Sequence, residues 1–483
     1  MNASVRLFSG LGWSALSQGV RIFLQLASIP LLARLLHPSD FGIYAMCMPV
    51  LGLAGLLQDF GLQQALVQKD RLDKNQMNMI FWINFAISLT VAASMFLLSG
   101  SIASFFSEPA LEDLMRAFSL ITLLGAIGFG QYALLNRDLR FKLIALIDMT
   151  CAIVSFIVVI ICAFYFRSYW ALWAGGIASV ITWILFSYLA TSWRPGFPRR
   201  SVDLDGMFRF GVHIMVHNFA VYFSRNFDAI LIGKFLGTYS LGLYDRAYKV
   251  LLFPIENLAQ PISRVMVPML ARGRGDRDEF SKIFILANSL LHLACLPALA
   301  ALIGSSDQFI LVFLGKGFSD VAPIFFWLGF AGFVQPLIIA SHWVLLSEGR
   351  SHTLMIMSLT SALFVSLCLL IGLRWGLIGV AIAYLCGEVF FRVPIMIWTV
   401  GRASIISYAV FFRNVTPIVA STIFTFLFTH FSNDIVSGLG LVFLNLVVAY
   451  FLGLLFLAVF PHGRAFLREV RLFLEIWLSE RVR

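Results

Sequence analysis

Long apolar runs recur along the whole chain, and short polar or charged segments separate them. A helix that crosses a bilayer needs about 20 mainly apolar residues, and about fourteen segments of the chain meet this requirement. They cover residues 10–35, 41–66, 78–102, 115–135, 144–166, 170–191, 208–236, 243–269, 281–304, 321–346, 353–373, 376–400, 409–430 and 437–460. The pattern therefore predicts an all-α protein with about fourteen transmembrane helices.

The composition agrees with a membrane protein and excludes a soluble globular one. Of the 483 residues, 60% are hydrophobic and only 12% are charged, whereas soluble domains carry about 25% charged residues. The longest connecting segments, around residues 192–207 and 305–320 and from 461 onward, are too short to form a separate catalytic domain.

The basic residues predict the orientation of the chain. The formal charge of +10 could suggest nucleic acid as a partner, but the basic residues stand in short clusters between the apolar runs. With the N-terminus in the cytosol, the connections on the outer side keep only Arg167, Lys316 and Arg374. Because cytoplasmic loops are the ones enriched in Lys and Arg, we expect both termini to be cytoplasmic and no nucleic-acid partner.

An internal repeat divides the chain. At an offset of 200 residues, Leu36, Gly42 and Tyr44 match Leu236, Gly242 and Tyr244. A second match pairs Trp170–Ala178 with Trp375–Ala383. Because this offset spans six predicted helices, it predicts two parallel six-helix lobes related by an axis along the membrane normal.

The predicted domain organisation follows from this repeat. It comprises an N-terminal lobe over 1–192, a cytoplasmic linker over 193–207, a C-terminal lobe over 208–402, an extra helix pair over 403–460 and a cytoplasmic tail over 461–483. The extra pair is nearly free of charge, so we expect it to face lipid. The tail has apolar residues at helical spacing with arginines between them, which predicts an amphipathic helix on the inner leaflet.

Polar residues inside the spans are the candidates for function. A charge there costs about 2.5 to 3.5 kcal/mol, so it faces protein or a water-filled cavity. The first span carries Ser14, Gln18, Arg21, Gln25 and Ser28 at steps of three and four, which is one continuous helical stripe. Arg21 has no acidic residue within four positions on its own helix.

Similar stripes follow the first two helices of the second lobe. They comprise His213, His217, Arg225 and Asp228 on 208–236, and Asp245, Lys249, Glu256, Gln260, Ser263 and Arg264 on 243–269. Asp59 adds a carboxylate to 41–66. We expect these stripes to line a hydrated cavity.

Several of these residues also have a purely structural interpretation. Glu388 and Arg392 are four apart, which favours mutual neutralisation. Asp228 could neutralise Arg225 in the same way. Asp148 and His292 are single polar residues in apolar spans, and the sequence indicates no partner for either.

The sequence indicates neither an enzyme nor a metal or cofactor site. His213 and His217 are spaced like metal ligands, but no third ligand is evident. The six cysteines lie in apolar runs without CxxC spacing, as core residues do. A phosphate-binding GK[ST] loop and a nucleophile elbow are both missing from the sequence.

Two motifs carry a family resemblance. They are LARLLHPSDFGIYAM at Leu32–Met46 and RNFDAILIGKFLGTYSLGLYDRAYK at Arg225–Lys249. The sequence resembles the multidrug/oligosaccharidyl-lipid/polysaccharide (MOP) flippase superfamily, and within it the Wzx-type lipid-linked oligosaccharide flippases among the prokaryotic polysaccharide transporters. The resemblance implies a V-shaped transporter of the bacterial inner membrane. Such a transporter moves undecaprenyl-pyrophosphate-linked sugar units outward by alternating access, for exopolysaccharide, capsule or O-antigen (lipopolysaccharide) synthesis, with a polysaccharide polymerase and export machinery as possible partners.

The resemblance also gives roles to the polar residues. Arginines suit a pyrophosphate because the guanidinium stays charged and binds phosphate oxygens in pairs. The expected headgroup ligands are Arg21, Arg225 and Arg264, with Arg246 and Lys249 receiving it near the outer end. Gln18, Gln25 and Gln260 would bind sugar hydroxyls. Asp59, Asp228 and Glu256 are the candidates for coupling to H⁺ or Na⁺.

Three other classes of protein agree less well with the sequence. A MATE-type drug or metabolite exporter shares the architecture, but Arg21 does not suit a cavity for cationic drugs. A membrane-embedded polysaccharide polymerase or glycosyltransferase would need a larger outer loop than 305–320. A scaffold for an assembly complex would not explain the polar stripes.

Overall fold

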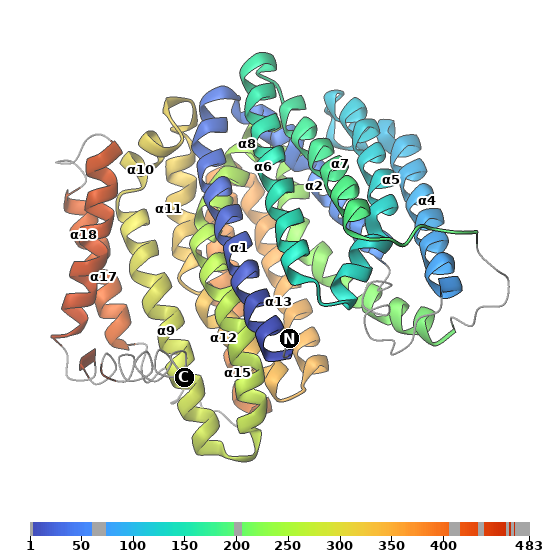
Figure 1. The fold of residues 1–483 in the computed structure, drawn as a ribbon. Helices are drawn as coiled ribbons and strands as arrows, with labels where there is room; N and C mark the ends of the chain where they lie inside the picture. Colours follow the sequence, from blue (N-terminus) through green and yellow to red (C-terminus); the bar gives the residue numbers. More distant parts are fainter. Residues whose placement is uncertain are drawn as a thin grey trace. The chain divides into compact units, whose positions relative to one another are not determined.

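The computed structural model of the chain describes residues 3–59, 74–197, 205–404, 416–432, 439–459, 463, 464 and 468, and every regular element within them is a helix (Figure 1). Ten helices of the described part are long and apolar enough to cross a membrane. The expectation of an all-α polytopic membrane protein is confirmed, while the count of fourteen spans stays a prediction. Large apolar side chains such as Leu97 and Phe431, which are 79% and 74% exposed, give the outer surface the character that lipid requires.

The chain divides into two compact units, residues 1–242 and 243–483. The first contains α1 (Ala3–Leu35), α2 (Pro38–Asp59), α4 (Lys74–Phe106), α5 (Ala110–Arg137), α6 (Phe141–Phe166), α7 (Trp170–Ala190) and the first part of α8 (Asp205–Arg272). In this unit α6 packs against both α1 and α7, and α5 packs against α4 and α7. The predicted domain boundaries rest on sequence repeats and stay a prediction.

The second unit holds the rest of α8 and the later helices. These are α9 (Arg277–Gly304), α10 (Ser306–Phe313), α11 (Val321–Gly332), α12 (Gln335–Ser347), α13 (Ser351–Gly372), α14 (Gly376–Gly387), α15 (Val393–Ala403), α17 (Thr416–Ser432) and α18 (Leu439–Leu457). One buried core of this unit joins the end of α8 to α9, α12 and α15 through side chains such as Leu270, Phe284, Trp343 and Val400.

The predicted spans 208–236 and 243–269 lie in α8, which consists of two helices that meet at a kink. The kink is at Gly237, whose φ of 79° and ψ of −177° are not helical. A side chain at this position would be strained because L-residues rarely adopt positive φ, and glycine has no Cβ to clash. The second family motif therefore includes the residue at which these two helices meet.

The turn between α1 and α2 is held by the first family motif. The Asp40 carboxylate accepts hydrogen bonds from the backbone N–H of His37 at 2.9 Å and of Tyr169, the residue before α7, at 3.1 Å. Asp40 thus fixes this turn and ties it to the start of α7. The HPSD segment of the motif is explained by this structural role.

The two copies of the repeated motif contact each other reciprocally. A Cβ on Gly42 would overlap the carbonyl oxygen of Thr238, and a Cβ on Gly242 would overlap that of Pro38. Since the repeat offset of 200 equates Pro38 with Thr238 and Gly42 with Gly242, each copy offers the same surface to the other. The repeated glycines are required by this approach of backbone to backbone.

One expectation about a connecting segment needs correction. Residues 305–320 do not form a plain loop, because α10 buries Phe309 and Ile310, and Leu314 and Phe318 beyond it are also buried. The helices α17 and α18 lie side by side next to α9 (Figure 1) and contact it. Large apolar side chains on them, such as Phe431 and Leu444, are exposed, and the expectation that this pair faces lipid stays a prediction. The tail over 461–483 lies outside the described residues except at 463, 464 and 468.

Candidate functional site

The predicted polar stripe on α1 is present. Arg21 Nη2 donates a hydrogen bond to Gln18 Oε1 at 2.6 Å, and Gln25 lies one turn further on, with its carbonyl accepting from Ser28 Oγ at 2.8 Å. The Arg21 side chain is 50% exposed. A half-exposed guanidinium in the middle of a span is a cation that an anionic group can reach.

Arg21 has a partner that the sequence did not indicate. Its Nη1 lies 3.9 Å from Oδ2 of Asp148 on α6, and the Tyr132 hydroxyl on α5 donates to Asp148 Oδ1 at 3.2 Å. This corrects the view of Asp148 as a residue without a partner. Spacing along the sequence predicts contacts only between residues of the same helix. The contact between Arg21, Asp148 and Tyr132 joins three helices and depends on the packing of α6 against α1 and α5.

The cations at the start of the second unit also have a counter-ion. Asp245 accepts from Arg246 at 2.7 Å and lies 3.0 Å from Lys249 Nζ. Arg246 and Lys249, which the sequence predicted as headgroup ligands near the outer end, share this one carboxylate, and their role as ligands stays a prediction. Arg246 is buried, whereas Lys249 remains 41% exposed and is the more accessible of the two.

Glu388 and Arg392 form the structural pair that their spacing predicted. Arg392 Nη1 lies 2.7 Å from Glu388 Oε1, and the Glu388 side chain has no exposed surface. The pair occupies a single π-helical turn between α14 and α15. One turn earlier, the Tyr384 hydroxyl lies 3.4 Å from that of Tyr248 on α8.

The remaining candidates are only partly described. Asp228 is half-buried and its Oδ1 accepts from the backbone N–H of Ala229 at 2.8 Å, while Glu256 is exposed. The side chains of Asp59, His213, His217, Arg225, Gln260 and Arg264 lie outside the described residues. His292, for which the sequence indicated no partner, is buried with its Nδ1 2.7 Å from the carbonyl oxygen of Asn288.

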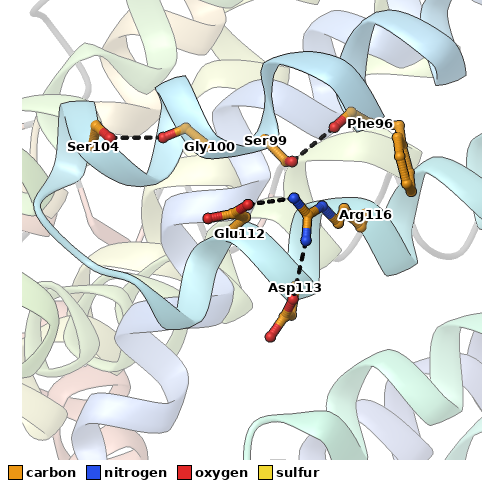
Figure 2. A network of polar contacts seen from close by, with 7 residues as sticks. All are labelled: Phe96, Ser99, Gly100, Ser104, Glu112, Asp113 and Arg116. Atoms are coloured by element: carbon orange, nitrogen blue, oxygen red, sulfur yellow. Dashed lines mark hydrogen bonds and ion pairs between the residues drawn. The ribbon is translucent and has the colours of Figure 1, made fainter.

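A second charged network lies where α4 and α5 meet, and its charged side chains pair with one another (Figure 2). Arg116 pairs with Glu112 and, at 3.6 Å, with Asp113 on the same helix, while its guanidinium lies 5.6 Å from the centre of the Phe96 ring. Both carboxylates belong to the first turn of α5, where the helix dipole favours negative charge. Its charges support the helix end and require no ligand.

Comparison with known proteins adds sequence relatives. A family model described as polysaccharide biosynthesis protein matches residues 31–323. The lipopolysaccharide biosynthesis protein WzxC of Escherichia coli (strain K12) is 24% identical over 80% of each chain. The teichuronic acid biosynthesis protein TuaB of Bacillus subtilis (strain 168) is 24% identical over 72% of each chain, and the succinoglycan biosynthesis transport protein ExoT of Rhizobium meliloti (strain 1021) is 24% identical over 65% of this chain and 63% of its own.

Solved structures share the fold. A lipid II flippase, MurJ, in an inward closed conformation superposes with a TM-score of 0.70 and 16% identity, covering 92% of this chain and 98% of its own. An inward-facing multidrug resistance transporter of the MATE family in the MOP superfamily gives 0.60 and 16% identity, covering 79% and 94%. The chain thus has the fold found in both of these transporters.

Proposed function

The chain belongs to the polysaccharide biosynthesis protein family, and we propose that it is a transporter, a flippase that moves lipid-linked oligosaccharides across the membrane. The substrate is a polyprenyl-pyrophosphate-linked sugar unit, and movement runs from the cytoplasmic to the outer leaflet by alternating access. The names of WzxC and ExoT and the fold shared with a lipid II flippase support this proposal.

The observation that carries the proposal is the half-exposed guanidinium of Arg21 on α1. A pyrophosphate is a compact polyanion, and a guanidinium contacts two of its oxygens at once. Gln18 already accepts one hydrogen bond from Arg21, and Gln25 offers an amide one turn away for a sugar hydroxyl. The polyprenyl chain stays in lipid while the headgroup moves past α1.

The other predicted ligands complete the proposed path. Arg225 and Arg264 bind the pyrophosphate together with Arg21, and Gln260 binds sugar. Lys249 receives the headgroup near the outer end, with Arg246 held behind it by Asp245. Asp59, Asp228 and Glu256 are the carboxylates that couple transport to H⁺ or Na⁺.

The proposal includes location and organisation. The protein is a multi-pass membrane protein, and we place it in the bacterial inner membrane with both termini in the cytoplasm. Two six-helix lobes rock about the substrate path. A polysaccharide polymerase and export machinery take the product onward.

One experiment tests the headgroup site directly. Binding of undecaprenyl pyrophosphate to the purified full-length protein in nanodiscs is compared for wild type, Arg21→Ala and Arg21→Lys. Loss of a charge-assisted contact of about 2 to 3 kcal/mol predicts about 30- to 150-fold weaker binding for Arg21→Ala. Arg21→Lys keeps the charge without the paired donors and should fall between the two.

The matched control is Arg140→Ala, which removes another half-exposed arginine of the first unit, paired with Asp138 at 3.9 Å. It should bind like wild type. Wild-type binding by a folded Arg21→Ala would remove Arg21 from the site. A MATE-type exporter, the second candidate supported by the shared fold, would bind organic cations and ignore the pyrophosphate lipid.

A further inference from the structure

Asp148 is the single acidic residue of the 26-residue helix α6, and it faces Arg21. A carboxylate at this depth costs about 2.5 to 3.5 kcal/mol to insert. Placed beside Arg21 it makes a neutral pair, so the cation proposed to bind the headgroup is already neutralised when no ligand is bound. A binding site built only for affinity would not contain this carboxylate.

The geometry of the pair is that of an exchangeable contact. The Arg21–Asp148 distance of 3.9 Å is longer than a charge-assisted hydrogen bond, which measures about 2.7 to 2.9 Å. The side chains are 50% and 25% exposed. In contrast, Arg392 and Glu388 approach to 2.7 Å with the carboxylate fully covered, as a fixed structural pair does.

Asp148 also accepts a hydrogen bond from a residue of α5. Tyr132 donates to its second oxygen at 3.2 Å, and the Tyr132 ring packs against Trp183 of α7 with centroids 5.4 Å apart. Gln18 similarly anchors Arg21 through Nη2. Each partner therefore keeps a hydrogen bond when the ion pair separates, which lowers the cost of exchanging one anion for another.

We propose that Asp148 is an internal competitor for Arg21 that weakens the binding of phosphate headgroups and promotes their release. A headgroup gains the contact with Arg21 only when it displaces the carboxylate, so every headgroup that binds there bears the same displacement cost. A pyrophosphate brings more charge and more acceptor oxygens than a monophosphate, so it displaces Asp148 more readily, and the returning carboxylate promotes release. Asp148 thus sets the affinity of the site, and this inference rests on the proposed function.

The test compares two probes, undecaprenyl pyrophosphate and undecaprenyl monophosphate, for binding to the full-length protein in nanodiscs. Asp148→Asn should bind both probes about five- to tenfold tighter, because it removes the competing charge. Tyr132→Phe removes the hydrogen bond that Asp148 keeps when it leaves Arg21, so the exchange costs more and both probes should bind about two- to threefold more weakly.

The matched control is Asp138→Asn, which removes a carboxylate that lies at the same 3.9 Å from its own arginine, Arg140. It should leave both affinities unchanged. Asp148→Asn and Tyr132→Phe are expected to change affinity in opposite directions, which separates competition from a general structural defect. If Asp148→Asn does not fold, Tyr132→Phe decides the question.

Two results overturn the inference, and they are distinguishable. If Arg21→Ala weakens binding but Asp148→Asn does not tighten it and Tyr132→Phe does not weaken it, the competitor role is wrong and the flippase site stands. If Arg21→Ala binds both probes as wild type does, the headgroup site is not at Arg21 and both proposals fail.

Discussion

Glu388 has a carboxylate with no exposed surface, and Arg392 supplies its neutralising charge from the same π-helical turn. Burying two charges is costly, and removal of one partner leaves the other uncompensated. The covered surroundings of this pair mark it as part of the structure, whereas the Arg21–Asp148 pair is open to exchange. Exposure and distance, taken together, distinguish these two kinds of ion pair in the same protein.

We expect Glu388→Gln to lower the free energy of unfolding by about 3 to 5 kcal/mol, because Arg392 would then be charged and unpaired. The double variant Glu388→Gln/Arg392→Met should be more stable than the single one. Unfolding of purified protein measures both. Asp113→Asn, at a 73% exposed carboxylate, is the control and should change stability by less than about 0.5 kcal/mol. If the double variant lost as much free energy of unfolding as Glu388→Gln and Arg392→Met lose separately when added together, the pairing would be contradicted.

At the scale of elements, the apolar runs predict helices because an unpaired backbone is not tolerated in lipid. The runs also place two separate spans at 208–236 and 243–269, and the structure has two helices there that meet at Gly237. They miss α10 because eight residues are too few for a span. Spacing along one helix correctly paired Glu388 with Arg392, but Asp148 needed the packing of α6 against α1.

The reciprocal contact between the two motif copies makes a prediction about elements. Gly42→Ala and Gly242→Ala each push a methyl group into a backbone carbonyl, at Thr238 and Pro38 respectively. Each should lower the free energy of unfolding by about 1 to 3 kcal/mol, as overpacking does. The double variant should lower the free energy of unfolding by less than the sum of the two single effects, because both changes open the same contact.

The matched control is Gly55→Ala on the same helix as Gly42, where an added Cβ meets no atom of the described residues within 4 Å. Alanine favours a helix interior over glycine, so this variant should be neutral or slightly stabilising. Thermal unfolding of the purified variants provides the comparison. If Gly42→Ala and Gly242→Ala are as well tolerated as Gly55→Ala, the two motif copies do not approach as closely as described.

At the scale of the whole molecule, residues proposed to bind the headgroup occur in both compact units. The first contains Arg21 with its glutamines, and the second contains Lys249 beside the Asp245–Arg246 pair. The chain belongs to the polysaccharide biosynthesis protein family and has the fold of a lipid II flippase. The proposed chemistry of headgroup binding rests on residues that the sequence already marks as polar within apolar helices.

Transport itself is the most direct test of this account. The purified protein is reconstituted in liposomes with an undecaprenyl-pyrophosphate-linked oligosaccharide, and arrival of the sugar in the opposite leaflet is measured with and without an imposed pH gradient. We expect wild-type protein to move the lipid, and Arg21→Ala at a matched protein level to move it at least about 30-fold more slowly when the substrate is dilute. Absence of movement by folded wild-type protein under every gradient, or equal movement by Arg21→Ala, would contradict the account.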